Sequence, residues 1–259
     1  MNNREEQIKA FGELLDIMDE LREKCPWDKK QTLESLRHLT IEETYELGDA
    51  ILDRDMNEIR KELGDLLLHI VFYSKIGSET QDFDIKDVID GINEKLIHRH
   101  PHVFGDTVVE DEEQVAQNWE QLKLKEGKKS ILEGVPKSLP AMIKASRIQD
   151  KAASAGFDWE EPGQVLDKVK EELAELEQEL ENPGNEKIEA EFGDVLFSMI
   201  NFSRFIKVDP ESALERTNKK FIKRFQFLEK EAKKNGESLK DLTLEQMDVY
   251  WNQSKKHFE

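Results

Sequence analysis

The chain has 259 residues, 37% of them charged and 37% hydrophobic, and its formal net charge at pH 7 is −19. This acidic balance argues against a protein that binds nucleic acids or anionic membrane surfaces, because binding to either needs basic patches on the protein. The large charged fraction, with only 13 Gly and 7 Pro, is typical of amphipathic helices with wide solvated faces.

Two further features bear on the compartment. The single cysteine, Cys25, cannot form an intrachain disulfide, and the polar first ten residues lack the apolar core of a signal peptide. The strongest apolar run, residues 66–73, is too short to span a bilayer. We therefore expect a cytoplasmic protein that has no membrane partner.

The first half predicts a series of helices separated by polar or proline-containing connections. Hydrophobic residues recur there at intervals of three and four positions, which is the periodicity of a helix with one buried face. The CPWD segment at 25–28 interrupts this pattern, because the residue before a proline is disfavoured in a helix. Helices are expected over residues 5–22, 31–52, 57–76, 88–97 and 115–125.

The second half repeats the organisation of the first. The segment 126–140 combines glycines, prolines and charges without a helical pattern, so we expect two domains, 1–126 and 127–259. Further helices are expected over 139–153, on either side of a turn at Asn182 to Asn185, over 212–234 and over 244–256. The predicted fold class is all-α, with about ten helices and no strand.

Four acidic residues recur in each half at a constant offset of 129 positions. The N-terminal quartet is Glu43, Glu46, Glu62 and Asp65, and the C-terminal quartet is Glu172, Glu175, Glu191 and Asp194. Residues three apart share a helix face, so antiparallel neighbouring helices would bring the two pairs of each quartet together.

Converging carboxylates repel one another, and a divalent cation removes that repulsion. An all-oxygen ligand set favours Mg2+, with Mn2+ as a substitute, and Mg2+ commonly takes substrate phosphates as further ligands. A single E-x-x-E pattern in so acidic a chain is ordinarily a solvated face. The doubling at one offset favours a metal and phosphate site.

Basic and aromatic pairs, spaced one helical turn apart, also recur in both halves. They are Lys220 with Arg224, Lys95 with Arg99, Trp251 with Lys255, and Trp119 with Lys123. Lysine and arginine bind phosphate oxygens, and an indole offers a face on which a nucleobase stacks. Taken alone, each tryptophan is more often a core residue and each Lys/Arg pair more often a surface pair. Their common repetition makes a nucleotide site as good an interpretation as these.

Six motifs cover nearly the whole chain: CPWDxxQTxxSL, E-E-x-x-E with E-x-x-D, HRHPHVFGD, GVPxxLPA, KAASAGFDW and NxKFxxRF. Together they resemble the MazG family of nucleoside triphosphate pyrophosphohydrolases. The resemblance implies two tandem MazG-like helical bundles, related to the all-α NTP pyrophosphatase (dimeric dUTPase-like) superfamily. It also implies Mg2+-dependent hydrolysis of nucleoside triphosphates to monophosphates and pyrophosphate, and a homodimer.

By position, the resemblance makes both quartets metal ligands. It assigns substrate contacts to Lys187, Lys220, Arg224, Trp251 and Lys255. We call the N-terminal and C-terminal halves the first and second copies of the repeat. Glu58 stands in the first copy where Lys187 stands in the second, so the second copy is expected to be the more active. The predicted catalytic residues are Glu171 and Glu172, with Glu42 and Glu43; the first of each pair is a candidate general base.

Broad base specificity and a housecleaning or stress role in the nucleotide pool are further expectations. Two other classes of protein compete with this interpretation. A ferritin-like di-iron oxidoreductase also uses bundle carboxylates, but it needs Glu-x-x-His pairs, and neither quartet contains one. The other competitor is a non-catalytic helical nucleotide-binding or scaffold protein with solvated acidic faces.

Overall fold

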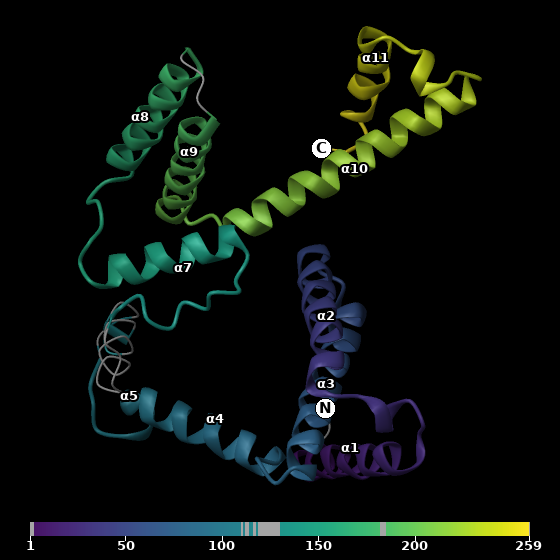
Figure 1. Ribbon diagram of the computed structural model, residues 1–259, viewed down its shortest axis with the longest axis vertical. Helices are drawn as coiled ribbons and strands as arrows, with labels where there is room; N and C mark the ends of the chain where they lie inside the picture. The colour runs from purple at the N-terminus through teal and green to yellow at the C-terminus, as the bar shows by residue number, and fades with distance from the viewer. Residues whose placement is uncertain are drawn as a thin grey trace. The chain divides into compact units, whose positions relative to one another are not determined.

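The computed structural model describes residues 3–109, 111, 114–115, 118, 130–181 and 185–258. Their regular secondary structure is all helical, with no strand among them, so the predicted all-α class is confirmed (Figure 1). The chain divides into two compact units, Met1–Val115 and Ala116–Glu259. The boundary expected between 126 and 127, and most of the helix expected over 115–125, lie outside the described residues.

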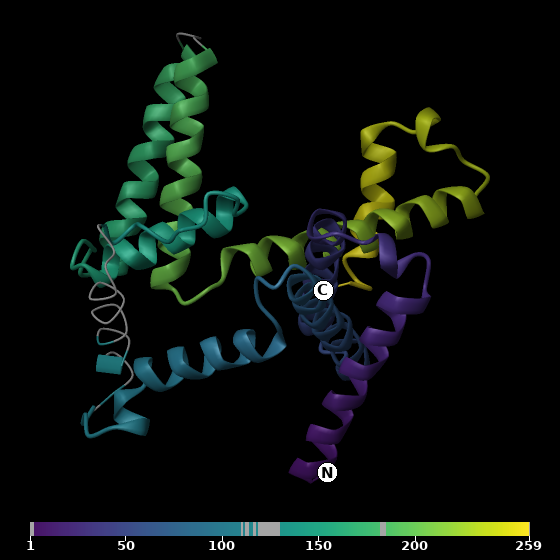
Figure 2. The ribbon, with the colours of Figure 1, turned by 60° about the horizontal axis from the view of Figure 1, so that its bottom comes forward.

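The N-terminal unit contains a hairpin of two long helices, α2 (Leu33–Asp53) and α3 (Met56–Glu79). Helix α2 ends at Arg54, whose φ of 56° places it in the left-handed region. The side chain of Asp55 then accepts hydrogen bonds from the first backbone N–H groups of α3. This two-residue link leaves the helices as antiparallel neighbours that pack against each other. Figure 2 shows the corresponding pair of the C-terminal unit, helices 162–181 and 185–205, side by side.

Helices α1 (Arg4–Lys24) and α4 (Ile85–Arg99) contact α3, and the short α5 (Pro101–Phe104) follows α4. The buried core of this unit joins α1, α2 and α3. Its members are Met18, Leu36, Val71 and Phe72. The predicted CPWD connection holds a 3-10 turn, Asp28–Lys30.

The C-terminal unit contains a corresponding hairpin, α8 (Pro162–Glu181) and α9 (Asn185–Phe205). Helix α7 (Ala141–Ser154) packs on α9, where Gln149 donates a hydrogen bond of 2.8 Å to the carbonyl of Phe197. The buried hydrophobic residues of the hairpin are Val165, Val169, Val195 and Ile200. Residues 182–184 of the expected turn lie outside the described part of the chain.

A second pair of helices completes this unit, α10 (Pro210–Lys234) and α11 (Leu244–Ser254), with the 3-10 turn Leu239–Asp241 between them. Helix α10 contacts α7 near its own N-terminal end and α11 toward its C-terminal end. Leu228 is only 3% exposed on the face that α10 turns to its neighbours. Gly236, with a φ of 74°, adopts the left-handed conformation that ends α10, which glycine tolerates without a steric penalty.

Candidate functional site

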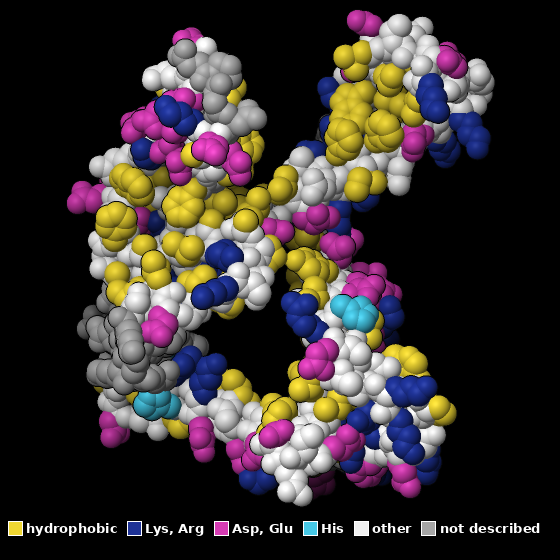
Figure 3. Space-filling view, in the orientation of Figure 1, with side chains coloured by type: hydrophobic (Ala, Val, Ile, Leu, Met, Phe, Trp, Pro, Cys, Tyr) yellow, Lys and Arg dark blue, Asp and Glu magenta, His cyan; other side chains and the backbone are white. Residues whose placement is uncertain are grey.

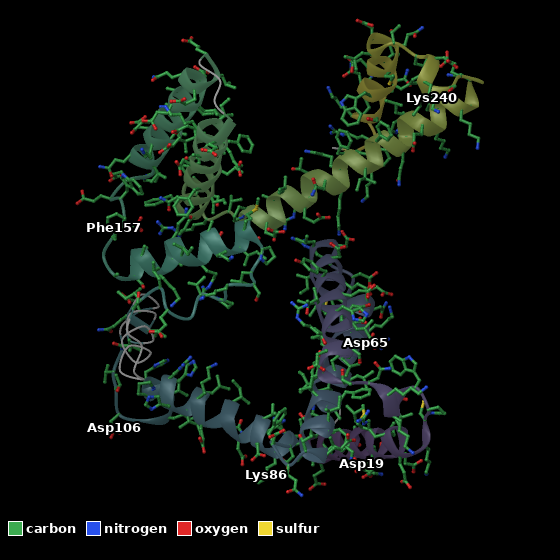
Figure 4. The ribbon with its side chains drawn as sticks, viewed as in Figure 1. Asp19, Asp65, Lys86, Asp106, Phe157 and Lys240 are labelled. Carbon is green, nitrogen blue, oxygen red and sulfur yellow. The ribbon has the colours of Figure 1, made fainter. Side chains whose placement is uncertain are left out.

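The N-terminal quartet lies on the hairpin of α2 and α3. Carboxylate oxygens of Glu43, Glu46 and Glu62 all lie within 4.8 Å of one another, a separation at which one cation can bind all three. Glu62 is 2% exposed and its Oε2 atom has no hydrogen-bond partner. Figure 4 places Asp65 on the same hairpin, where side-chain oxygens gather on one side. A buried polar oxygen without a partner is unfavourable, and a bound cation would satisfy it.

The electrostatics of this quartet follow from its geometry. Burial raises the pKa of Glu43, and the carboxylates of Glu62, Asp65 and Glu46 raise it further. Asp65 lies outside the group of three oxygens, but it is close enough to act on Glu43. The N-terminal quartet therefore concentrates acidic side chains whose mutual repulsion a bound cation would offset.

The C-terminal quartet has the same arrangement on α8 and α9. Oxygens of Glu172, Glu175 and Glu191 lie within 4.8 Å of one another, Glu172 is 7% exposed, and the Oε2 atom of Glu191 is buried without a partner. Burial raises the pKa of Glu191, and Glu175, Asp194 and Glu172 are the neighbouring charges that add most. Figure 3 shows acidic and basic side chains mixed over this part of the α8–α9 pair.

Both oxygen sets fit a hard divalent cation. The ligand atoms are carboxylate oxygens, they come from two rigid helices, and one oxygen in each set is buried and unpartnered. Among the described residues, neither group includes a histidine or a cysteine, as a di-iron or zinc site would require. As metal ligands, the eight residues stay a prediction.

One lysine enters each acidic group, and neither is among the residues predicted for a site. Lys168 Nζ lies 2.6 Å from Glu172 Oε1 and 2.9 Å from Glu171 Oε1. Lys61 Nζ lies 3.0 Å from Glu62 Oε1. Helical spacing points to the first contact, since Lys168 precedes Glu172 by one turn. Neighbouring residues on a helix face different directions, so spacing gives no signal for the second.

Four of the predicted basic and aromatic residues of the second half lie on α10 or on α11 and its C-terminal cap: Lys220, Arg224, Trp251 and Lys255. The rings of Phe221 and Trp251 lie 5.0 Å apart, and Arg224 donates two hydrogen bonds, of 3.0 and 2.6 Å, to the carbonyl of Phe258. Lys255 Nζ contacts Asn252 Oδ1 at 2.9 Å, and Lys220 lies on α10. Among the described residues, α10 packs on α7 and α11, so these side chains lie on a different pair of helices from the C-terminal quartet.

The remaining predicted residues have different positions. Lys187 lies in the first turn of α9 and contacts Glu179 at 3.3 Å, so it belongs to the hairpin that carries the C-terminal quartet. Lys95 and Arg99 lie on α4, which contacts α3 and α5, and Glu42 is exposed on α2. Trp119 and Lys123 lie outside the described residues.

The sequence model of a protein family, the MazG nucleotide pyrophosphohydrolase domain, matches residues 31–104 and 160–226 of this chain. The chain belongs to this family. Each match contains one of the two carboxylate hairpins. The matched residues make up more than half of the chain, in the tandem arrangement that the repeat predicts.

Relatives match along nearly the full length. This MazG-family chain is 46% identical over 250 residues to the nucleoside triphosphate pyrophosphohydrolase/pyrophosphatase MazG of Thermotoga maritima, covering 95% of each chain. It is 41% identical over 258 residues to the nucleoside triphosphate pyrophosphohydrolase of Escherichia coli, covering 96% of this chain and 98% of the relative. A crystal structure of a mazG-related protein from Thermotoga maritima aligns with a TM-score of 0.40 and 26% identity, over 44% of this chain and 98% of that one.

Among the described residues, no helix has the length and apolar character that crossing a bilayer requires.

Proposed function

We propose that this protein hydrolyses nucleoside triphosphates to nucleoside monophosphates and pyrophosphate, and that the reaction depends on Mg2+. The observation that carries the proposal is the pair of carboxylate groups, each with a buried oxygen that lacks a partner, in a chain of the MazG family. The names of full-length relatives support the same reaction.

The residues divide the chemistry between them. Glu172, Glu175 and Glu191 would hold the cation in the second copy, with Asp194 beside them; bound Mg2+ would polarise a phosphoryl oxygen and draw in the triphosphate. Glu171 is exposed at the edge of this group and accepts a hydrogen bond from Lys168, which positions its side chain beside the ligands. From this position it can accept a proton from the attacking water, while pyrophosphate leaves the α phosphorus.

The aromatic pair on α10 and α11 supports broad base acceptance. Phe221 is 55% exposed and packs against Trp251, so this pair has a ring surface open to a nucleobase. Stacking tolerates every base, because each has a π face, whereas hydrogen-bonded readout discriminates. A broad hydrolase of triphosphates suits removal of unwanted nucleotides from the cytoplasmic pool, which is the housecleaning or stress role that we propose.

The test is a product assay on the full-length chain with a panel of canonical and modified triphosphates. We expect pyrophosphate and the monophosphate in equal amounts from several bases. A chelator should stop the reaction, and added Mg2+ or Mn2+ should restore it. Release of inorganic phosphate with a diphosphate, or activity that persists without divalent cations, would contradict the proposal.

An apolar groove in the C-terminal unit supports the proposed homodimer. Its volume is about 860 Å³ and it is lined by α7, α9 and the start of α10, with Phe197, Met199 and Ile206 among its side chains. Each of these three is more than 40% exposed. Figure 3 shows hydrophobic side chains gathered over this region. Contiguous exposed apolar surface commonly marks an interface, and a second copy is the partner that the family resemblance implies.

Substitution of Phe197 by Asp should therefore shift the protein from dimer to monomer, because a charge at the centre of an apolar interface is costly to bury. Light scattering or sedimentation measures the change. Leu180→Asp is the matched control, since Leu180 is 58% exposed on α8 and lies outside the groove. A parental chain that is monomeric, or a Phe197→Asp chain that stays dimeric, would contradict this part of the proposal.

A further inference from the structure

Each buried ligand carboxylate is paired with a lysine, but the two lysines come from positions that are not equivalent. Lys168, in the second copy, corresponds at the offset of 129 to Leu39 in the first. Lys61, in the first copy, corresponds to Ala190 in the second. The repeat therefore explains neither lysine, and each copy has its own way of placing an ammonium group at its carboxylates.

The lysine of the first copy has a second partner. Lys61 Nζ lies 3.0 Å from Glu62 Oε1 and 3.3 Å from Glu58 Oε2. Glu58 occupies the position equivalent to Lys187, the residue that the family resemblance assigns to substrate. The first copy therefore still has a positive charge near this position, because Glu58 holds the ammonium group of Lys61, one helical turn further along α3.

The exposures of this pair differ sharply. The Glu62 side chain is 3% exposed and the Lys61 side chain is 61% exposed, so the ammonium group approaches the buried carboxylate from the rim. A lysine has a flexible four-carbon stem and a compact charge, so its Nζ atom can move several ångströms without movement of the helix. A divalent cation bound to the Glu62 carboxylate repels the ammonium group of Lys61, which contacts the same carboxylate, so the two compete for it.

We propose that Lys61 is the phosphate-binding residue of the first copy, held on Glu58 and Glu62 until a divalent cation takes its place at Glu62. The displaced ammonium group then lies at the rim of the metal site, where the phosphates of a nucleotide or of a free polyphosphate would bind. Lys61 thus takes in the first copy the part expected of Lys187 in the second. This inference rests on the proposed function of the quartets.

Two consequences follow for binding at the first copy. Removal of Lys61 removes a competitor of the metal, so Mg2+ alone binds more tightly. The same change removes a phosphate contact, so a polyphosphate binds more weakly in the presence of Mg2+. These changes have opposite signs, which a general loss of structure does not produce.

The experiment uses the full-length chain with Glu172→Gln and Glu191→Gln, which disable the second quartet. Isothermal titration with MgCl2, and then with tripolyphosphate at saturating Mg2+, compares Lys61→Met with Lys9→Met. Lys9 forms an exposed ion pair with Glu13 on α1, so its substitution is matched in charge and side chain. We expect Lys61→Met to tighten Mg2+ binding about three- to tenfold and to weaken tripolyphosphate binding about tenfold. Lys9→Met should change neither, and Lys61→Arg should retain tripolyphosphate binding.

Equal affinities in Lys61→Met and Lys9→Met would overturn the inference. Weaker binding of both probes, without recovery in Lys61→Arg, would assign Lys61 a structural role and overturn it as well. If no variant binds Mg2+ at the first copy, the inference fails. The proposed function then still stands if the parental chain releases pyrophosphate with Mg2+, because the second copy supplies that activity.

Discussion

A chain that carries both Glu172→Ala and Glu43→Ala should lose pyrophosphate release by about 10³-fold or more, since even the loss of a group that only supports a metal ligand commonly costs 10–100-fold. Each substitution removes an oxygen from a group of three that lie within 4.8 Å of one another. Loss of one carboxylate from each group weakens Mg2+ binding and displaces the ion from its productive position, so both copies would lose most of their activity.

The single substitutions should separate the two copies. Glu175→Ala is expected to cost more activity than Glu46→Ala, because the second copy has Lys187 and Lys168 at its hairpin whereas the first has Lys61. Steady-state pyrophosphate release measures both. A larger loss from Glu46→Ala would reverse the assignment of the more active copy.

Glu177→Gln is the matched control for the second copy. Glu177 is exposed on α8, two residues after Glu175 and therefore on a different face of the helix. Its substitution changes the charge of the chain by the same amount as a ligand substitution to glutamine.

For the variant that carries both Glu172→Ala and Glu43→Ala, activity at the parental level would exclude the quartets as the catalytic metal site.

Mg2+ should raise the thermal stability of the protein, and the quartets should be the reason. Ligand bound only to the folded state stabilises it by about 2.7 kcal/mol at one hundred times Kd. In a unit of this size that corresponds to a rise in Tm of about 5–15 °C. Glu191→Gln should raise the Tm of the metal-free protein, because it removes one repelling charge, and it should reduce the increase that Mg2+ causes.

The pH dependence of the metal-free protein follows from the same charges. The folded-state pKa values of Glu43 and Glu191 are raised, so their ionisation destabilises the fold fully at neutral pH. This destabilisation is relieved as the pH falls through the raised values toward the ordinary glutamate pKa of 4.5. We therefore expect Tm to rise on mild acidification without Mg2+, and the rise to vanish with saturating Mg2+, since protons and metal compete.

A second pair of residues, Arg204 and Asp158, sets the pH below which further acidification destabilises the protein. Arg204 donates to both carboxylate oxygens of Asp158, at 2.8 and 2.5 Å, and lowers its pKa below the ordinary 3.8. Stability from this pair is present above 3.8 and is lost as the pH falls through the lowered value. Differential scanning fluorimetry across pH, with and without Mg2+, measures both effects. A metal-free Tm that falls steadily from neutrality would contradict the role given to Glu43 and Glu191.

Helices and their pairing were predictable because the information is local. Hydrophobic periodicity predicts a helix over 57–76, and α3 runs from Met56 to Glu79. Its start is explained by one residue, Asp55, whose side chain caps the first turn. Since the link between α2 and α3 is so short, spacing alone also predicts that Glu43 and Glu62 face each other. The group of oxygens that includes them agrees with this expectation.

What the sequence by itself determined is therefore the all-α fold, the two carboxylate hairpins and the family. Tertiary structure decided which oxygens are buried, because packing between helices, and not spacing along one helix, leaves Glu62 at 2% exposure while Glu46 is exposed. It also decided that Lys61 and Lys168 reach these oxygens, since long flexible side chains are directed by their neighbours in space. The grouping of Phe221 with Trp251 on α10 and α11, rather than with the C-terminal quartet, has the same cause.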